Sequence, residues 1–588
     1  MKIIKYKFIF LILLTAFFYS CQEFIEPTPT EHMREWQVLQ NRDNFRGAMY
    51  WTYASLPTRQ NYVFEAATDN AVVNNENTVA SRMARGGISA LSNELDAIDQ
   101  NSISGTLWDF NLTNINMINY VLDRLLSGDI QTRFNIDDDT VNDAWIKLLK
   151  GEGFFLRAWF EFELLKTYGG PGADGTMYGF PIMTKYTTTD DNLDVPRNTY
   201  QQCVDQILSD CDQAIQNLAF TYDRLGGAIW DGGTTGIGRA SGLAAMALKS
   251  RALLYAASPA FNPGNDAEKW RKAAAAAKEL IDKTGFDDLM SLNDYYVNHR
   301  LSLNNDANTL NNNRDLFLRG RLTNGTRDLE TESFYPRASG NAVYHPSQNL
   351  VDAFPMSNGY PISSASADLP YDVNDMYANR DPRLTAFIGY DGQAAYGMAN
   401  PNPATLQTAP GGADAFGRHD NATRTGYYLK KWLYSGVRLT GSTVNTDFTA
   451  IIFSRPELYL NFAEAAIQAT GNPDDKTFGY SAREVLAKVR DRALGEGNDK
   501  YLSTVTGKDQ FIEVVKNERR VELCFQSQRF WDIRRWSTGK SDLSAVNASV
   551  YGMYSSTPVE TRSYNSPYFP IPYGELLKSK NLVNNDGW

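Results

Sequence analysis

Helical periodicity in two separate blocks constrains the fold of this chain more than any other feature. The segment 199–218 opens with the capping-box spacing Thr199–Gln202 and then repeats apolar residues on one helical face. Similar patterns, begun by proline or serine or ended by glycine, predict further helices at 145–168, 242–257, 267–283, 456–470, 481–494 and 508–525. The sequence therefore predicts a mainly α protein of stacked, tetratricopeptide-like helix pairs, although no clean repeat signature is present.

The stretch between the helical blocks, residues 291–454, lacks helical periodicity and is rich in Asn, Gly, Pro, Ser and Tyr. Long irregular segments in a compact body usually carry function, because loops present side chains to solvent. Its aromatic residues include Tyr295, Tyr296, Tyr335, Tyr344, Tyr360, Tyr371, Tyr377, Tyr390, Tyr396, Tyr427 and Tyr428. We expect this loop-rich region to bind the ligand.

The N-terminus has the pattern of an export signal. Lysines at positions 2, 5 and 7 precede the apolar run 8–18, which is shorter than the roughly 20 residues that span a bilayer. Cys21 stands at the cleavage point, as in a bacterial lipobox, and predicts a cysteine acylated with chains such as palmitate. Phe18 and Tyr19 are poor lipobox residues, so secretion without a lipid is the alternative.

Composition and spacing argue against several classes of protein. The net charge of −11 and pI near 5.1 disfavour nucleic acid, which is captured by basic surfaces. The histidines are scattered, with no HExxH or CxxC motif, so we expect no metal and no cofactor. Cys203 and Cys211 lie about 12 Å apart on one predicted helix, beyond disulfide reach. With Cys524 they are expected to be free, buried thiols.

Several segments, in the same order, resemble one protein family. They are GEGFFLRAWFEFELLKTYGG (151–170), RPELYLNFAEA (455–465), KNERRVELCFQSQRFWDIRRW (516–536) and FPIPYGELLKSKNLVNNDGW (569–588). Weaker matches are VPRNTYQQCVDQI (195–207), GRASGLAAMALKSRALLYAAS (238–258), LVDAFPMSNGYPI (350–362) and RDPRL (380–384). On these residues the chain is identified as similar to the SusD/RagB family of nutrient-binding outer-membrane lipoproteins.

The resemblance implies a SusD-like fold, in which four tetratricopeptide-type helix pairs support an irregular, loop-built domain. It also implies a surface-exposed, lipid-anchored protein that binds a glycan and delivers it to a SusC-like TonB-dependent outer-membrane barrel. Peptide binding, or a lid with little affinity of its own, is the first alternative, and a tethered glycoside hydrolase is the second. The expected divisions are a signal peptide (1–20), lipidated Cys21 and tether (21–35), an N-terminal helical region (36–290), the loop-rich region (291–454) and a C-terminal helical region with its tail (455–588).

Charged and glycine-rich motifs favour structural over catalytic roles. The glycine-rich run 226–242 lacks a Walker lysine, and no GxSxG motif is present, so we expect a binding protein and not an enzyme. Charges three and four apart on a helix pair with one another. An ion network is therefore expected from Glu518, Arg519, Arg520, Glu522, Arg529, Asp532, Arg534 and Arg535. A core position is expected for Trp108, Trp145, Trp159, Trp531 and Trp536.

Candidate ligand residues follow from the chemistry of sugars, which present apolar faces rimmed by hydroxyl groups. Such a ligand needs aromatic platforms and polar side chains for its hydroxyls. Two loop constellations combine these groups, although any one aromatic residue in them is more often a packing residue. The candidates are Tyr62, Asp69 and Asn70 in one loop and Tyr295, Tyr296, Asn298 and Arg300 in the other.

Overall fold

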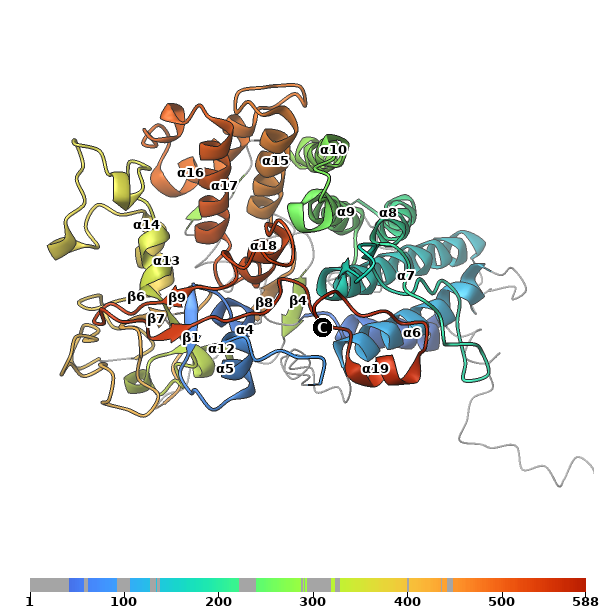
Figure 1. The fold of residues 1–588 in the computed structure, drawn as a ribbon, viewed down its shortest axis with the longest axis horizontal. Helices are drawn as coiled ribbons and strands as arrows, with labels where there is room; N and C mark the ends of the chain where they lie inside the picture. Colours follow the sequence, from blue (N-terminus) through green and yellow to red (C-terminus); the bar gives the residue numbers. More distant parts are fainter. Residues whose placement is uncertain are drawn as a thin grey trace, which may run out of the picture.

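A row of packed α-helices forms one side of the protein and an irregular, loop-rich part forms the other (Figure 1). The computed structural model describes residues 42–57, 62–91, 106–126, 134, 138–220, 239–286, 289, 291–292, 319–322, 328–398, 401–434, 436–440 and 448–588. Cys21 and most of the glycine-rich run lie outside these residues. No helix that the structure describes has both the length and the apolar character of a membrane span.

The helical scaffold follows chain order except at one junction. Its members are α3 (Arg42–Ala54), α6 (Leu107–Leu126), α7 (Asp139–Tyr168), α8 (Tyr200–Asn217), α9 (Gly242–Ala257), α10 (Ala267–Thr284), α15 (Arg455–Thr470), α16 (Ala482–Leu494) and α17 (Lys508–Glu522). Each helix from α6 to α10 packs on the next, α10 packs on α15, and α15 contacts both α16 and α17. This confirms the mainly helical fold class.

Most helix ends lie where the sequence places them. Thr199 and Gln202 form the predicted capping box of α8, and Ser481 and Glu484 form that of α16. Helix α15 ends at Gly471, which adopts a left-handed φ of 73°.

Two boundaries differ from prediction. Helix α7 begins at Asp139, because Asp138 accepts hydrogen bonds from the backbone N–H groups of Thr140 and Val141. Helix α17 ends at Glu522, before the expected Phe525, which adopts a φ of 55° that a right-handed helix cannot accommodate.

Glycines in α7 set the spacing of the first helices. A Cβ at Gly151 would lie 2.7 Å from Cγ of Leu218, which directly follows α8, and a Cβ at Gly153 would lie 2.7 Å from a methyl group of Leu122 in α6. Neither separation is compatible with van der Waals contact. The sequence GEG therefore allows α6 and the end of α8 to approach α7 closely.

Outside the scaffold helices the protein contains short helices and two-stranded antiparallel ribbons, most of them in the loop-rich part (Figure 1). The helices are α4 (Tyr62–Ala66), α5 (Val79–Ala84), α12 (Asp328–Ser333), α13 (Gln348–Ala353), α14 (Pro382–Phe387), α18 (Arg529–Arg535) and α19 (Tyr573–Lys578). The strand pairs are β1 (Ala71–Val73) with β5 (Tyr344–Pro346), β2 (Gly170–Pro171) with β3 (Met177–Tyr178), β4 (Arg319–Leu322) with β8 (Phe448–Ile451), β6 (Ile388–Gly389) with β7 (Tyr428–Leu429), and β9 (Ser549–Val550) with β10 (Glu560–Thr561).

Segments distant in sequence meet in this part. Strand β1 pairs with β5 in the register Val72 to His345, so a piece of the predicted N-terminal helical region joins the loop-rich region in space. The divisions at 290 and 454 stay predictions about chain order.

The hydrophobic core agrees with most sequence expectations. Trp108, Trp145, Trp159 and Trp531 are buried, whereas Trp536 is only partly buried and donates its indole N–H to Glu464 over 2.8 Å. The expected free thiols are confirmed for Cys203, Cys211 and Cys524, all of which are buried.

Candidate ligand-binding site

The first predicted ligand constellation is packed into the protein. Tyr62 is 1% exposed, and its ring makes edge contacts with Tyr344 and Phe525 at centroid distances of 5.7 and 5.5 Å. Asn70 is fully buried and donates to Glu65 over 2.6 Å. Both side chains therefore have packing roles in this structure and are not accessible to a ligand, because tertiary contacts cover α4, which begins at Tyr62, and the residues after it.

Asp69, the third member of that constellation, forms ion pairs. Its carboxylate lies 2.8 Å from Arg520 and 3.2 Å from Arg529. Burial opposes the charged form of Asp69, but the two guanidinium groups outweigh it and hold the pKa of this carboxyl well below its usual range. Asp69 thus attaches the N-terminal loop to α17 and to the start of α18.

The second predicted constellation was Tyr295, Tyr296, Asn298 and Arg300. These four residues lie outside the described residues. Their role stays a prediction.

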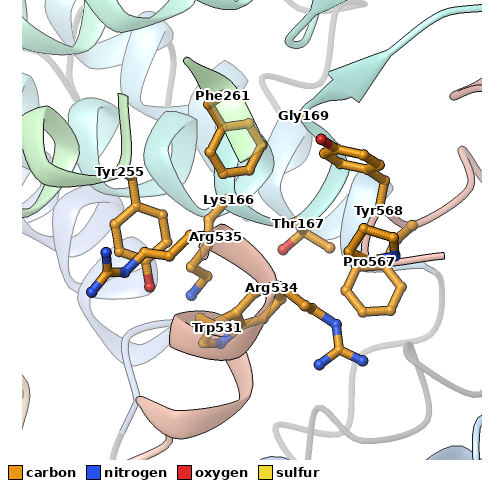
Figure 2. A pocket seen from close by; sticks show the side chains of 11 residues that line it. Lys166, Thr167, Gly169, Tyr255, Phe261, Trp531, Arg534, Arg535, Pro567 and Tyr568 are labelled. Carbon is orange, nitrogen blue, oxygen red and sulfur yellow. The ribbon is translucent and has the colours of Figure 1, made fainter. Parts of the chain in front are cut away.

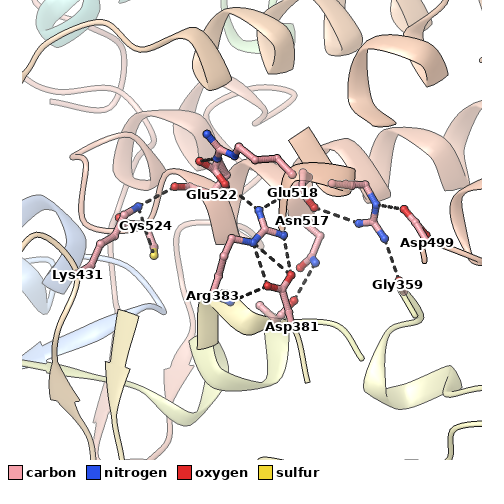
Figure 3. A network of polar contacts seen from close by, with 12 residues as sticks. Gly359, Asp381, Arg383, Lys431, Asp499, Asn517, Glu518, Glu522 and Cys524 are labelled. Atoms are coloured by element: carbon pink, nitrogen blue, oxygen red, sulfur yellow. Dashed lines mark hydrogen bonds and ion pairs between the residues drawn. The ribbon is translucent and has the colours of Figure 1, made fainter. Parts of the chain in front are cut away.

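A buried ion network joins the loop-rich part to the helical scaffold (Figure 3). The guanidinium of Arg383 in α14 donates to Asp381 over 2.7 Å. It also donates to two carboxylates of α17, Glu518 over 2.5 Å and Glu522 over 2.8 Å. Arg490 in α16 donates to the other oxygen of Glu518 over 3.0 Å. All these carboxylates are occupied by structural partners, so the predicted charge cluster holds the two parts together.

A second group of buried charges lies where α15, α17 and α18 meet. Arg535 donates to both oxygens of Glu464, at 2.5 and 2.7 Å, and Arg519 donates to Asp532 at 3.0 and 3.1 Å. Bidentate guanidinium–carboxylate pairs of this kind suit buried positions better than lysine pairs. The prediction of a structural ion network for the α17–α18 segment is confirmed except for Arg534, whose guanidinium lies over the ring of Phe530 and donates to its backbone carbonyl.

A small cavity lies between the end of α7, α9, α18 and the C-terminal tail (Figure 2). Its walls include Thr167, Tyr255, Arg534 and Tyr568, and its volume is about 10 Å³. That is the space of about one water molecule, whereas ligand pockets measure roughly 300 to 1,000 Å³. This cavity cannot hold a sugar ring.

Four tyrosines of the described chain are half-buried or exposed and are linked by the contacts given below, and we call them the tyrosine surface: Tyr377, Tyr390, Tyr551 and Tyr554. The rings of Tyr377 and Tyr390 stack at a centroid distance of 3.8 Å and an interplanar angle of 16°. Tyr551 and Tyr554 are 37% and 42% exposed.

Hydrogen bonds connect the elements of the tyrosine surface. The Tyr377 hydroxyl lies 3.3 Å from that of Tyr427, which donates to Gln348 over 2.6 Å. The backbone N–H of Gln348 donates to the carbonyl of Tyr551 over 2.9 Å. Burial raises the pKa of Tyr377, so its hydroxyl remains protonated at neutral pH. The tyrosine surface is therefore a pre-formed arrangement.

Sequence reasoning found half of this group. Tyr377 and Tyr390 belong to the loop aromatics of residues 291–454, whereas Tyr551 and Tyr554 lie in the predicted C-terminal helical region. The spacing of the tyrosines in VYGMY (550–554), between the β9 strand and a turn, was the available signal. Among the residues that the structure describes, no cluster of three or more His, Cys, Asp or Glu side chains could hold a metal ion.

Comparison with known proteins settles the family. A SusD family model matches residues 312–588, and a second, described as starch-binding and associating with the outer membrane, matches residues 30–227. This chain belongs to the SusD family. SusD-like protein P2 of Formosa agariphila is 28% identical over 174 residues, which cover 29% of this chain and 32% of that relative.

Solved structures of SusD-like proteins share the fold. A SusD-like protein of Bacteroides fragilis has a TM-score of 0.69 at 23% identity, with 95% of this chain and 100% of that chain covered. A SusD-like carbohydrate-binding protein of the same organism has a TM-score of 0.66 at 18% identity, with 92% and 99% covered. A SusD homologue of Bacteroides thetaiotaomicron has a TM-score of 0.66 at 16% identity, with 95% and 99% covered.

Proposed function

We propose that this SusD family member is a lipid-anchored protein of the outer-membrane surface that binds a glycan and delivers it to a SusC-like TonB-dependent barrel. The observation that carries the proposal is the match of two SusD-type family models to successive parts of the chain, one of them described as starch-binding and associating with the outer membrane. The similarity of this fold to that of a Bacteroides fragilis protein described as carbohydrate-binding supports the proposal.

The described geometry supports binding without catalysis. The buried carboxylates of the α17–α18 segment are engaged by guanidinium groups, so they are not free to act as acid and base on a substrate. Aromatic rings with adjacent amide and carboxylate groups suit the apolar faces and hydroxyls of a sugar. We propose that the protein captures its ligand and leaves it chemically unchanged.

Affinity electrophoresis and calorimetry against a panel of polysaccharides, oligosaccharides and peptides test the ligand class. Binding to a glycan supports the proposal. Binding to peptides alone, or to nothing in the panel, would replace it with the peptide-binding or lid alternative. Release of reducing sugar from the same panel would replace it with a hydrolase.

The anchor and the partner need separate tests. Mass spectrometry of the processed protein should find acyl chains on Cys21, and Cys21→Ser should move the protein from the outer-membrane fraction to the soluble fraction. An unmodified amino terminus would point to secretion without a lipid. Native purification from outer membranes should recover the protein with a TonB-dependent barrel, and recovery of the protein alone would count against the delivery role.

A further inference from the structure

The tyrosine surface combines rings with acceptors in a way that ordinary packing does not require. Asp391 directly follows Tyr390, and its Oδ1 accepts hydrogen bonds from the backbone N–H groups of Thr408 at 2.7 Å and Ala409 at 3.0 Å. Its Oδ2 makes no hydrogen bond with any residue that the structure describes. The carboxylate is therefore oriented by the backbone, with one oxygen left for another donor.

The exposed ring of Tyr554 lies close to this carboxylate. The Tyr554 hydroxyl is 3.4 Å from the hydroxyl of Thr408, whose backbone N–H binds Asp391. The residue before Tyr554, Met553, contacts the Tyr377 hydroxyl through its sulfur at 2.9 Å. One exposed ring, one stacked ring pair and one oriented carboxylate thus share a single surface.

A second carboxylate near the tyrosine surface offers further hydrogen-bond acceptors to a ligand. Asp352, which is exposed, accepts a hydrogen bond of 2.7 Å from the side-chain amide of Gln348. Gln348 in turn accepts from the hydroxyl of Tyr427. Carboxylate oxygens accept strong hydrogen bonds from sugar hydroxyls, because a charged acceptor strengthens the bond.

The cations nearest these acids hydrogen-bond to backbone carbonyls. Arg380 donates to the backbone carbonyls of Val351 and Phe354, both at 2.7 Å. Lys430 donates to the carbonyl of Thr385 over 2.7 Å, and burial lowers its pKa to about 8. The guanidinium and ammonium groups thus bond to backbone oxygens, although the charge of Arg380 also acts on Asp352. Asp391 is therefore the acid that most directly repels an anion.

We propose that the tyrosine surface is a glycan subsite selective for uncharged sugars, in which Tyr554 stacks on an apolar sugar face and Asp391 accepts a hydrogen bond from a hydroxyl. This inference rests on the proposed glycan-binding function and names its site and ligand class. The stack of Tyr377 on Tyr390 fixes those two rings, and the contact of the Tyr554 hydroxyl with Thr408 restricts the Tyr554 ring, before the ligand arrives, which reduces the entropic cost of binding. Polar groups between the rings favour a sugar over an apolar protein surface.

Charge provides the selectivity. A uronate or sulfate at contact distance from one carboxylate is disfavoured by about 1 kcal/mol even in water-like surroundings, which is about fivefold in affinity. Uncharged xylan, galactomannan and starch should therefore bind better than polygalacturonate, alginate and carrageenan if the sugar residues are otherwise accepted.

Affinity electrophoresis of the full mature protein on these six polysaccharides tests the inference with matched variants. Tyr554→Ala should lower affinity for a bound neutral polysaccharide about tenfold, which corresponds to loss of about 1.4 kcal/mol. Tyr573→Ala removes a ring of similar exposure, 45%, on α19 and should change nothing. Asp391→Asn retains the acceptor for Thr408 and should weaken neutral binding about fivefold while improving binding of anionic polysaccharides.

The outcomes separate the subsite from the function. If the wild-type protein binds a neutral polysaccharide and Tyr554→Ala and Asp391→Asn bind it equally well, the subsite is wrong while glycan binding stands. Binding restricted to anionic polysaccharides, or binding of peptides lost in Tyr554→Ala, would also overturn the subsite. Binding of no glycan at all would overturn the proposed function and the subsite together. Thermal unfolding of Tyr554→Ala should match that of the wild type, because Tyr554 lies at the surface, and Asp391→Asn should unfold close to it, because an amide oxygen can still accept from Thr408 and Ala409.

Discussion

The guanidinium of Arg197 donates a hydrogen bond of 2.9 Å to Oδ1 of Asn585, 388 positions later in the chain. The same group donates to the backbone carbonyls of Tyr168, Gly179 and Val583, at 2.6 to 2.9 Å. Arg197 therefore attaches the C-terminal tail to the start of α8. Burial without a carboxylate partner lowers the pKa of Arg197 to about 10, which still leaves it charged at neutral pH.

Replacing Arg197 should release the tail. Arg197→Met leaves several buried carbonyls and the Asn585 amide oxygen without a donor, so we expect the free energy of unfolding to fall by about 3 kcal/mol. Limited proteolysis should cut residues 579–588 faster. Lys578→Met, at a side chain that is 68% exposed, is the control and should have little effect. An unchanged cleavage rate for the tail would contradict this role of Arg197.

Removing Arg383 should have a larger effect. Arg383→Met leaves Asp381, Glu518 and Glu522 as buried carboxylates with one cation fewer, and breaking a buried network in this way costs about 3 to 5 kcal/mol. Urea denaturation measures the loss. Arg271→Met provides the comparison, because Arg271 pairs with Glu268 in an exposed position. A loss below about 1 kcal/mol for Arg383→Met would mean that the network is not needed for stability.

Glu161 should be replaceable with a gain in stability. Burial, reinforced by the charge of Asp210, raises the pKa of Glu161 well above its usual value of 4.5. The folded protein therefore holds a proton that the unfolded chain releases, so the contribution of Glu161 to stability declines as the pH rises above 4.5. Glu161→Gln should raise the free energy of unfolding at pH 8 by about 1 to 3 kcal/mol. The difference should shrink at pH 5.

The control for that measurement is Asp205→Asn on the exposed face of α8, which should change stability little at either pH. If Glu161→Gln destabilises the protein at pH 8, the carboxylate is charged and well solvated in the native state, contrary to the structure.

His345 should make the loop-rich part sensitive to acid. Burial, assisted by the charge of Arg424, lowers the pKa of His345 from 6.5 to about 3. Because the unfolded chain then binds a proton that the folded protein refuses, stability is lost as the pH falls from 6.5 toward 3. Between pH 6.5 and 4.5 the loss should reach about 2 to 3 kcal/mol, at 1.36 kcal/mol for each pH unit.

His345→Asn isolates this contribution, since an amide oxygen can still accept the backbone N–H of Arg424, which lies 3.1 Å from Nδ1. Denaturation of both proteins at pH 6.5 and 4.5 should show the variant losing less stability than the wild type. Equal losses would assign the acid sensitivity to other groups.

Local sequence signals predicted the scaffold well. Capping residues such as Thr199 and Ser481 act within one helical turn, so their effect can be read from adjacent positions. The charge cluster was also recognisable, but its partner Arg383 comes from α14, more than a hundred residues earlier, and nothing local links it to Glu518. The pairing of Arg383 with Glu518 depends on how the helices pack in the folded protein, which neighbouring residues in the sequence do not indicate.

The candidate site was predicted less well, because exposure of a loop residue depends on what folds over it. The residues adjacent to Tyr62 in the sequence suggest an exposed tyrosine, yet Tyr344 and Phe525 cover its ring in the folded protein. Conversely, Tyr554 lies between the segments 516–536 and 569–588 that carry the family resemblance, and only folding brings it beside Thr408.

The packing of α10 on α15 has a consequence for the export that we propose. The apolar face of α10, with Ala277, Leu280 and Ile281, finds its partner only after the whole insertion between Thr284 and Arg455 has been made. In a chain that crosses a membrane starting from its amino end, the apolar face of α10 would therefore stay exposed until α15 has also crossed, and an exposed apolar face is prone to aggregate. Chaperones that bind unfolded chains should be needed most while the residues between Thr284 and Arg455 are crossing.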